Sequence, residues 1–235
     1  MTLSFSRNSQ TGTGQGNELS LGTHQLEEVT KYKYLGTIID NKLSFKHHLS
    51  QILNRVGHKL YLLRKIRGSL TEKAARDIYT MAILPYIDMS DIIYAIGPAT
   101  KINKLQILQN QAIRLIKKLP PRTNVDEQHK ELKLQPLAIR REIHLLETAF
   151  YMAQNPSNRE TISRPTRSQA EGRLNLRTAR INVTKYQNTF THRSAIAWNA
   201  LPTDIHKIEH KKVFKMMVTK LLVDDEPMLG APDTP

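Results

Sequence analysis

The stretch Tyr32-Lys33-Tyr34-Leu35-Gly36-Thr37-Ile38-Ile39-Asp40 carries the clearest strand pattern in the chain. Its side chains alternate between two faces, one with Tyr32, Tyr34 and Ile38 and the other with Leu35, Thr37 and Ile39. Aromatic and β-branched residues at a period of two predict a β-strand. Asp40 and Asn41 tolerate turn geometry and should end it. Gly36 falls inside this predicted strand, where a glycine commonly marks the close approach of another backbone or a ligand.

A long basic helix is predicted directly after the strand, from Ser44 to Gly68. Apolar residues recur there at steps of three and four, which is the spacing of one helix face: Phe45, Leu49, Ile52, Leu53, Val56, Leu60, Leu63 and Ile66. Ser44 is a favourable N-cap and Gly68 a favourable C-terminal stop. Basic side chains occupy other positions, mostly in the second half: Arg55, Lys59, Arg64, Lys65 and Arg67.

Further helices are predicted along the rest of the chain. Capping-box spacing at 69–72 starts a second helix, which Pro85 should kink or end. Helical patterns follow at 86–96, 101–119, 124–132 and about 137–154. Residues 157–185 are rich in arginine and poor in large apolar side chains, which indicates a mobile basic linker. A short helical segment then contains Trp198, expected to be its core anchor, and a last helix spans 207–223.

The predicted fold class is mainly α. A small N-terminal β-hairpin or short sheet is followed by a helical bundle, a basic linker and a short helical C-terminal unit. The expected divisions are 1–43, 44–155, 156–187, 188–223 and an acidic disordered tail at 224–235. The strand patterns at 1–6 and 32–39 would lack further partners for their sheet.

The amino-acid composition limits which binding partners and which cellular compartment are expected. Lys plus Arg is 35 and Asp plus Glu is 21, so the net charge is +14 and the pI is near 10.0, which indicates a polyanionic partner. Nucleic acid is favoured over a membrane surface, because the apolar helix faces are needed for a core. The absence of cysteine excludes disulfides, thiolate nucleophiles and cysteine-bearing zinc sites. Without an apolar run of roughly 20 residues or a secretory signal, a soluble nuclear or cytoplasmic protein is expected.

Residues with catalytic chemistry are not found in any recognisable arrangement. The aspartate pair at 224–225 follows a helix without a second strand, so it is predicted to be a solvated tail rather than a polymerase metal site. Asp88 and Asp91 could share a helix face, but without a further ligand they are not expected to bind a metal. His47 and His48 point to different sides of the helix and are expected to face solvent or phosphate. Neither a nucleophile elbow nor a phosphate-binding glycine loop is present.

The order of these motifs resembles a known family. An aromatic-Lys-Tyr-Leu-Gly strand, a tight turn and a long helix are similar to the end of the palm and the start of the thumb in reverse transcriptases of LINE-type, jockey-like non-LTR retrotransposons. Further motifs follow in the family's order: Leu-Pro-Tyr-Ile-Asp at 84–88, Leu-Gln-Ile-Leu-Gln-Asn-Gln-Ala-Ile-Arg at 105–114 and Leu-Lys-Leu-Gln-Pro-Leu at 132–137. Trp-Asn-x-Leu-Pro at 198–202 with the basic helix after it resembles the C-terminal segment of many LINE-type polyproteins.

This resemblance implies that the strand pair is the primer grip, which holds the 3′ end of the growing DNA strand. Met1 would then lie inside a palm domain whose larger part is missing, and the chain would be a truncated reverse transcriptase. It would bind an RNA/DNA primer-template, but without the catalytic aspartates it is not expected to polymerise DNA. Mg²⁺ is expected only for the full-length polymerase, and no other cofactor is expected.

The predicted nucleic-acid-binding residues come from two sources. The resemblance implies the grip residues Lys33, Tyr34, Leu35 and Gly36, whereas charge and periodicity select Arg55, Lys59, Arg64 and Lys65 on the helix. Together they would form a cradle for a nucleic-acid backbone. Two alternatives stay open: an independent nucleic-acid-binding module with no link to polymerisation, and a helical protein-interaction scaffold whose basic surface serves solubility. The oligomeric state is not predicted.

Overall fold

The computed structural model describes residues 20–21, 24–25, 29–155, 175–178, 187 and 189–224, and the chain forms two units, Met1–Lys133 and Leu134–Pro235. The described part is mainly helical with small N-terminal hairpins, which confirms the predicted fold class. The strand pattern at 1–6, most of the basic linker and the acidic tail after Asp224 lie outside the described residues. Among the helices that are described, none is both long enough and apolar enough to cross a membrane.

The predicted strand at 32–40 is a β-hairpin. Strand β3 (Lys31–Tyr34) pairs antiparallel with β4 (Thr37–Asp40), and β1 (Ser20–Leu21) pairs with β2 (His24–Gln25). Leu35 and Gly36 form the two-residue turn, with φ of 46° and 89°. Positive φ at both central residues is what the favoured hairpin turns require, so Gly36 belongs to the turn and not to a strand interior. In this register Tyr32 pairs with Ile39, so its side chain shares a face of the hairpin with Ile39 and not with Ile38.

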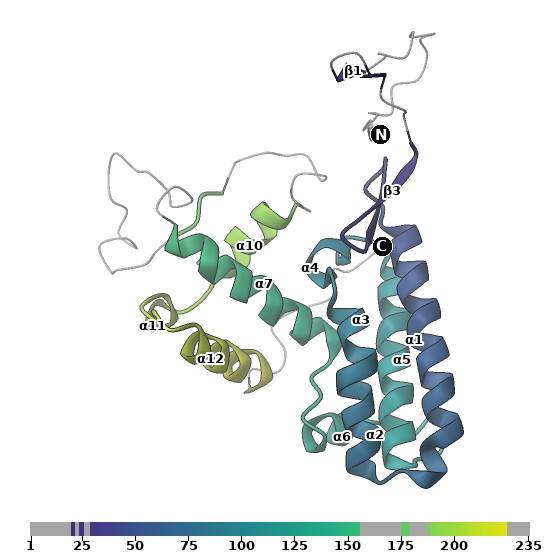
Figure 1. Cartoon of the computed structure of the whole chain (residues 1–235). Helices are drawn as coiled ribbons and strands as arrows, with labels where there is room; N and C mark the ends of the chain where they lie inside the picture. The colour runs from purple at the N-terminus through teal and green to yellow at the C-terminus, as the bar shows by residue number, and fades with distance from the viewer. Residues whose placement is uncertain are drawn as a thin grey trace, which may run out of the picture. The chain divides into compact units, whose positions relative to one another are not determined.

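Unit 1 is a helical bundle in which α1 packs against α5 and α3 (Figure 1). Its helical segments are α1 (Lys46–Ile66), the 3₁₀ turn η1 (Arg67–Ser69), α2 (Glu72–Ile78), the π-helical η2 (Tyr79–Ile83), α3 (Leu84–Asp88), α4 (Asp91–Tyr94), α5 (Ala99–Lys117) and α6 (Asp126–Glu131). The apolar stripe of α1 is buried as its period predicts, at Leu49, Ile52, Val56, Leu60 and Leu63.

The helix predicted to run from 72 onward changes its helix type close to Pro85, which lacks a backbone donor. The wide π turn of η2 ends at Ile83, two residues before Pro85, which is the second residue of α3. Proline has no N–H and crowds the preceding turn, so a local change of helix type is the expected response. The helix predicted at 86–96 is wrong as a single element, because Met89 is extended and Ser90 has a φ of 62°. Helices α3 and α4 are therefore separate.

Unit 2 packs α7 (Leu137–Gln154), α10 (Phe190–Asn199), α11 (Thr203–His206) and α12 (Lys211–Asp224) around one aromatic core. Trp198 is 1% exposed, and its ring lies 5.6 Å from Phe214 and 4.9 Å from His206, which confirms it as the core anchor. Phe150 of α7 belongs to the same core. Because α7 buries its apolar face in this core, the division between the units falls at Lys133, whereas the sequence pattern places it at 155.

Candidate nucleic-acid interface

Asp40 fastens the hairpin to the start of α1. Its carboxylate accepts hydrogen bonds from the backbone N–H of Lys42, Ser44 and Phe45 at 3.2, 3.0 and 2.9 Å, and from the Ser44 hydroxyl at 3.1 Å. Burial alone would raise the pKa of Asp40, but the hydrogen bonds from Ser44, Phe45 and Lys42 outweigh it and lower the pKa. Asp40 thus organises the helix start that the sequence pattern assigned to Ser44 as N-cap. Phe45, directly before the helix, is left-handed with a φ of 53°.

His48 holds the second strand of the hairpin on α1. Its Nδ1 accepts a hydrogen bond from the backbone N–H of Ile38 at 3.3 Å, and its ring lies 5.9 Å from that of Tyr94. Burial, helped by the charge of Arg55, lowers the pKa of His48, so the neutral imidazole is favoured. The expectation that His48 faces solvent or phosphate is therefore wrong. The reason is that β4 covers this position of the helix.

The outer strand of the hairpin is exposed throughout. Every residue of β3 is exposed, and so is Leu35 in the turn. Tyr34 is 58% and Leu35 83% exposed, which is a high exposure for large apolar side chains that adjoin Lys33. Thr37, in contrast, is buried and its hydroxyl is hydrogen-bonded to that of Ser90. The hairpin therefore presents a basic and aromatic surface while its other strand fixes it to the bundle.

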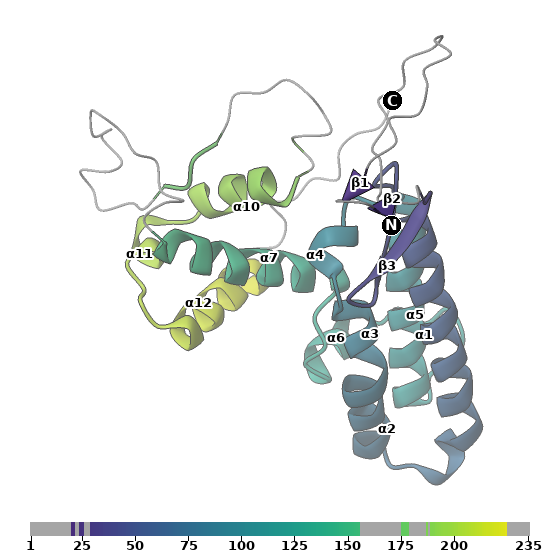
Figure 2. The same cartoon turned by 45° about the horizontal axis from the view of Figure 1, so that its top comes forward.

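Gly36 lies close to a side chain of this chain, whereas another backbone or a ligand was expected there. A Cβ at Gly36 would lie 2.7 Å from the Cε of Met89, which follows the last residue of α3. The turn of the hairpin thus lies on the end of α3. In both views β3 is near the N-terminal end of α1 and the upper end of α3 (Figure 1, Figure 2).

Arg55 and Lys59 lie on the hairpin side of α1. Arg55 is seven residues after His48. At about 100° per residue this is about 20° short of two full turns, so Arg55 and His48 lie on the same side of the helix. The guanidinium carbon of Arg55 is 5.9 Å and the Nζ of Lys59 is 4.8 Å from the centroid of the Tyr86 ring on α3. Neither cation forms an ion pair with an acidic side chain in the described part of the chain. Their charge is therefore free to meet an anion.

Arg64 and Lys65 are not brought to the same surface. Arg64 is nine residues after Arg55, which puts it about half a turn around the helix and about 13 Å further along its axis. Lys65 lies over the ring of Tyr61, with its Nζ 5.3 Å from the centroid. The four predicted helix positions thus separate into a pair that contacts Tyr86, Arg55 and Lys59, and two residues in the last turn of α1, Arg64 and Lys65.

Tyr86 and Met89 adjoin the candidate interface, although the sequence pattern did not select them. Tyr86 lies in the Leu-Pro-Tyr-Ile-Asp stretch at 84–88, so its motif was visible. The proximity of Tyr86 to Arg55 could not be predicted, because the sequence does not show that α3 packs along this side of α1.

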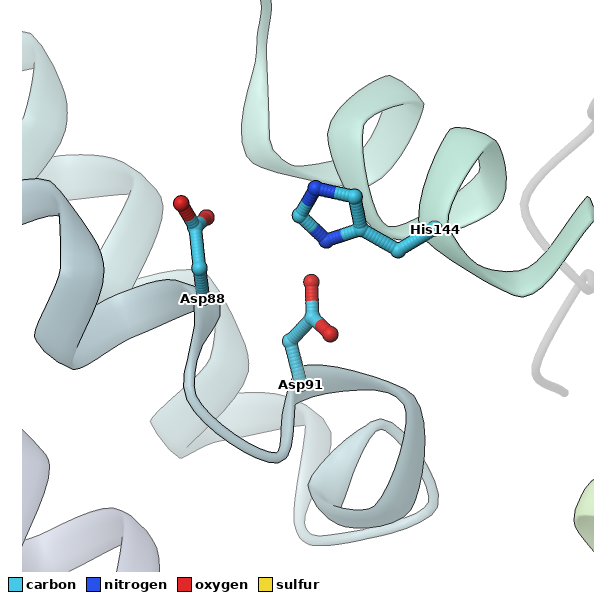
Figure 3. Close-up of side chains that lie close together, drawn as sticks. All are labelled: Asp88, Asp91 and His144. Carbon is cyan, nitrogen blue, oxygen red and sulfur yellow. The ribbon is translucent and has the colours of Figure 1, made fainter. Parts of the chain in front are cut away.

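Asp88 and Asp91 do not share a helix face. Asp88 is the last residue of α3 and Asp91 the first of α4, with the chain turning between them (Figure 3). The premise of the sequence-based interpretation is therefore wrong, since the helix is broken at Met89. Figure 3 also draws His144, which belongs to α7 of the other unit. Within unit 1, two carboxylates alone do not define a metal site.

Three curated Drosophila melanogaster proteins illustrate what this chain is similar to. The probable RNA-directed DNA polymerase from transposon BS is 29% identical over 112 residues, 46% of this chain and 12% of that protein. The RNA-directed DNA polymerase from mobile element jockey is 27% identical over 129 residues, 53% and 14% respectively. The probable RNA-directed DNA polymerase from transposon X-element is 27% identical over 165 residues, 69% and 18% respectively.

These matches relate the chain to RNA-directed DNA polymerases of mobile elements. More narrowly, the related region is that of the LINE-type, jockey-like non-LTR retrotransposon reverse transcriptases, as the order of the motifs predicted. The matches span less than a fifth of the length of these relatives. No family model and no solved structure matches the chain.

Proposed function

We propose that unit 1 is a thumb-like region of a non-LTR retrotransposon reverse transcriptase that holds the backbone of a primer-template duplex. The hairpin would act as a primer grip, and the adjoining side of α1 as a phosphate-binding surface. One observation carries the proposal: two cations without acidic partners in the described residues, Arg55 and Lys59, lie on the side of α1 that carries the exposed basic and aromatic strand β3. The relatives' names supply the polymerase context.

The chemistry of the surface suits a nucleic-acid backbone. Arginine and lysine neutralise phosphates and position a duplex without reading its sequence. Tyr34 and Leu35 offer exposed apolar area that can pack against a sugar or a base. Gly36 allows the turn to lie close to Met89, which fixes the position of the exposed Leu35 relative to α3.

The proposed role is binding and positioning rather than catalysis. Polymerisation uses two metal ions held by carboxylates. The proposal assigns no metal site of this kind to unit 1, and the aspartate pair at 224–225 begins at the end of α12. The metal-dependent step would belong to the complete polymerase.

A salt titration tests the phosphate contacts. Replacing Arg55 and Lys59 by glutamine should weaken binding of an RNA–DNA hybrid about tenfold at moderate salt. It should also lower the slope of log K against log salt by about two, because about one counterion is released per phosphate contact. Fluorescence anisotropy with a labelled hybrid measures both.

The matched control replaces Lys73 and Lys130 by glutamine. Both are exposed in unit 1, on α2 and α6, and these helices lie at the end of the bundle remote from β3 (Figure 1). The change in net charge is the same, so affinity should stay within about twofold and the slope should be kept. An equal loss of affinity in both double variants would mean that only the net charge of the protein matters for binding. An unaltered chain that binds no hybrid at any salt would leave the protein-interaction scaffold as the better account.

A further inference from the structure

Tyr86 contacts both cations of the proposed phosphate surface. Arg55 and Lys59 are four residues apart on α1, so they lie on one face about 6 Å apart along the helix axis. Like charges at this spacing repel each other, and both side chains are long and flexible. The Tyr86 ring attracts the two groups from the neighbouring helix, at 5.9 and 4.8 Å. It therefore offsets the repulsion and limits the positions that each can take.

The place of Tyr86 in α3 is not that of a core residue. Leu84 and Ile87 carry the buried face of this helix, whereas Tyr86 is half-buried and turned toward α1. Both cations of the proposed surface lie beside its ring. The observed contacts suit a residue that orients cations more than one that binds bases.

We propose that Tyr86 is a positioning residue that aligns Arg55 and Lys59 for two neighbouring phosphates of the same nucleic-acid strand. This inference rests on the proposed function and specifies how its surface recognises the ligand. A preorganised pair of cations loses less conformational freedom when the phosphates bind. The ligand class is therefore the regular phosphate backbone of a duplex, recognised through the spacing of its charges.

A double-mutant cycle tests the proposal with the full chain and an RNA–DNA hybrid of fixed sequence. Tyr86→Leu should weaken binding about three- to fivefold although no charge is lost, and Tyr86→Phe should stay within twofold because the ring is kept. When Arg55 and Lys59 are both glutamine, Tyr86→Leu should cause no further loss. Circular dichroism should show that all of these variants are folded at the temperature of the binding measurement.

Each other outcome overturns the inference. A loss that persists in the background without the two cations would mean that Tyr86 contacts the nucleic acid itself. A loss in Tyr86→Phe as large as in Tyr86→Leu would assign the effect to the hydroxyl. No loss in Tyr86→Leu would mean that the ring does not orient the cations. If instead the Arg55 and Lys59 replacements leave affinity unchanged, the proposed function itself fails, so the two failures are distinguishable.

A measurement on the unaltered protein covers the case in which Tyr86→Leu does not fold. Protons close to the face of an aromatic ring are shifted upfield in NMR spectra. The Cε protons of Lys59 should show this shift, whereas those of the exposed Lys104 on α5 should not. Equal chemical shifts for the two lysines would contradict the contact on which the inference depends.

Discussion

At the scale of single residues, Asp40 connects the hairpin to the bundle through one carboxylate. It ends β4, and its carboxylate accepts hydrogen bonds from Lys42, Ser44 and Phe45. The sequence predicts that the strand ends at Asp40 and Asn41, and β4 does end at Asp40. Its role in starting α1 was not visible, because a left-handed residue at Phe45 displaces the N-cap that Ser44 would otherwise form.

Asp40→Asn should lower the free energy of unfolding by about 2 kcal/mol at pH 7, since hydrogen bonds to a charged group are replaced by weaker ones. The pKa of Asp40 is lowered in the folded state, so its stabilisation is present above the unfolded-state pKa of about 3.9 and is lost as the pH falls through the folded-state pKa. The difference between the variant and the unaltered protein should therefore shrink below about pH 4. Urea unfolding at pH 7 and pH 3 measures it.

The control is Asp204→Asn, because the side chain of Asp204 is 94% exposed. It should leave the unfolding free energy unchanged within about 0.5 kcal/mol at either pH. A destabilisation by Asp40→Asn that is equally large at pH 3 would contradict the assigned role of the ionised carboxylate.

At the scale of the elements, Arg67 joins the end of α1 to the end of α5. The sequence pattern grouped it with the exposed basic positions, but it is buried. Its Nε donates to the carbonyl of Leu115 at 2.9 Å, its Nη1 to Leu70 at 2.6 Å and its Nη2 to Ile116 at 2.5 Å. Carbonyls in the last turn of a helix lack partners within the helix, so a guanidinium is well suited to them.

Arg67→Met should destabilise unit 1 by about 3 kcal/mol, because three buried or partly buried carbonyls lose a charged donor. Urea unfolding followed by far-ultraviolet circular dichroism measures the loss. Arg64→Met, three residues earlier and exposed, should change stability by no more than about 0.5 kcal/mol. Similar effects of the two substitutions would show that the observed hydrogen bonds of Arg67 contribute little.

At the scale of the whole molecule, the two units have separate cores. Trp198 is the single tryptophan of the chain and lies in the core of unit 2. Its fluorescence therefore reports the unfolding of unit 2, whereas circular dichroism reports the helices of both units. This gives a way to observe each unit in the full-length protein.

Phe214→Ala should lower the fluorescence-detected unfolding free energy by about 3–5 kcal/mol, because a fully buried aromatic ring is lost from the core around Trp198. Arg67→Met should leave that fluorescence transition unchanged while it shifts the circular dichroism transition of unit 1. Should both substitutions move both signals together, the units would unfold as one cooperative body and the separate cores would not act independently.

The sequence by itself determined the helical class, the span of α1 and its buried stripe, the end of α7 near Gln154 and the anchoring role of Trp198. These follow from local periodicity and from the burial of large apolar side chains, which act over one or two helical turns. The order of motifs also determined the relationship to jockey-like reverse transcriptases, because that order depends on the residues alone.

Only the tertiary structure decided which side chains meet. Gly36 became a turn residue because β4 folds back on β3, and His48 was buried because β4 covers it. The packing of α3 along α1 selected Arg55 and Lys59, with Tyr86, from several basic residues of similar pattern. Periodicity shows which face of a helix is apolar, but the neighbour that covers an adjoining face depends on contacts between residues far apart in the chain.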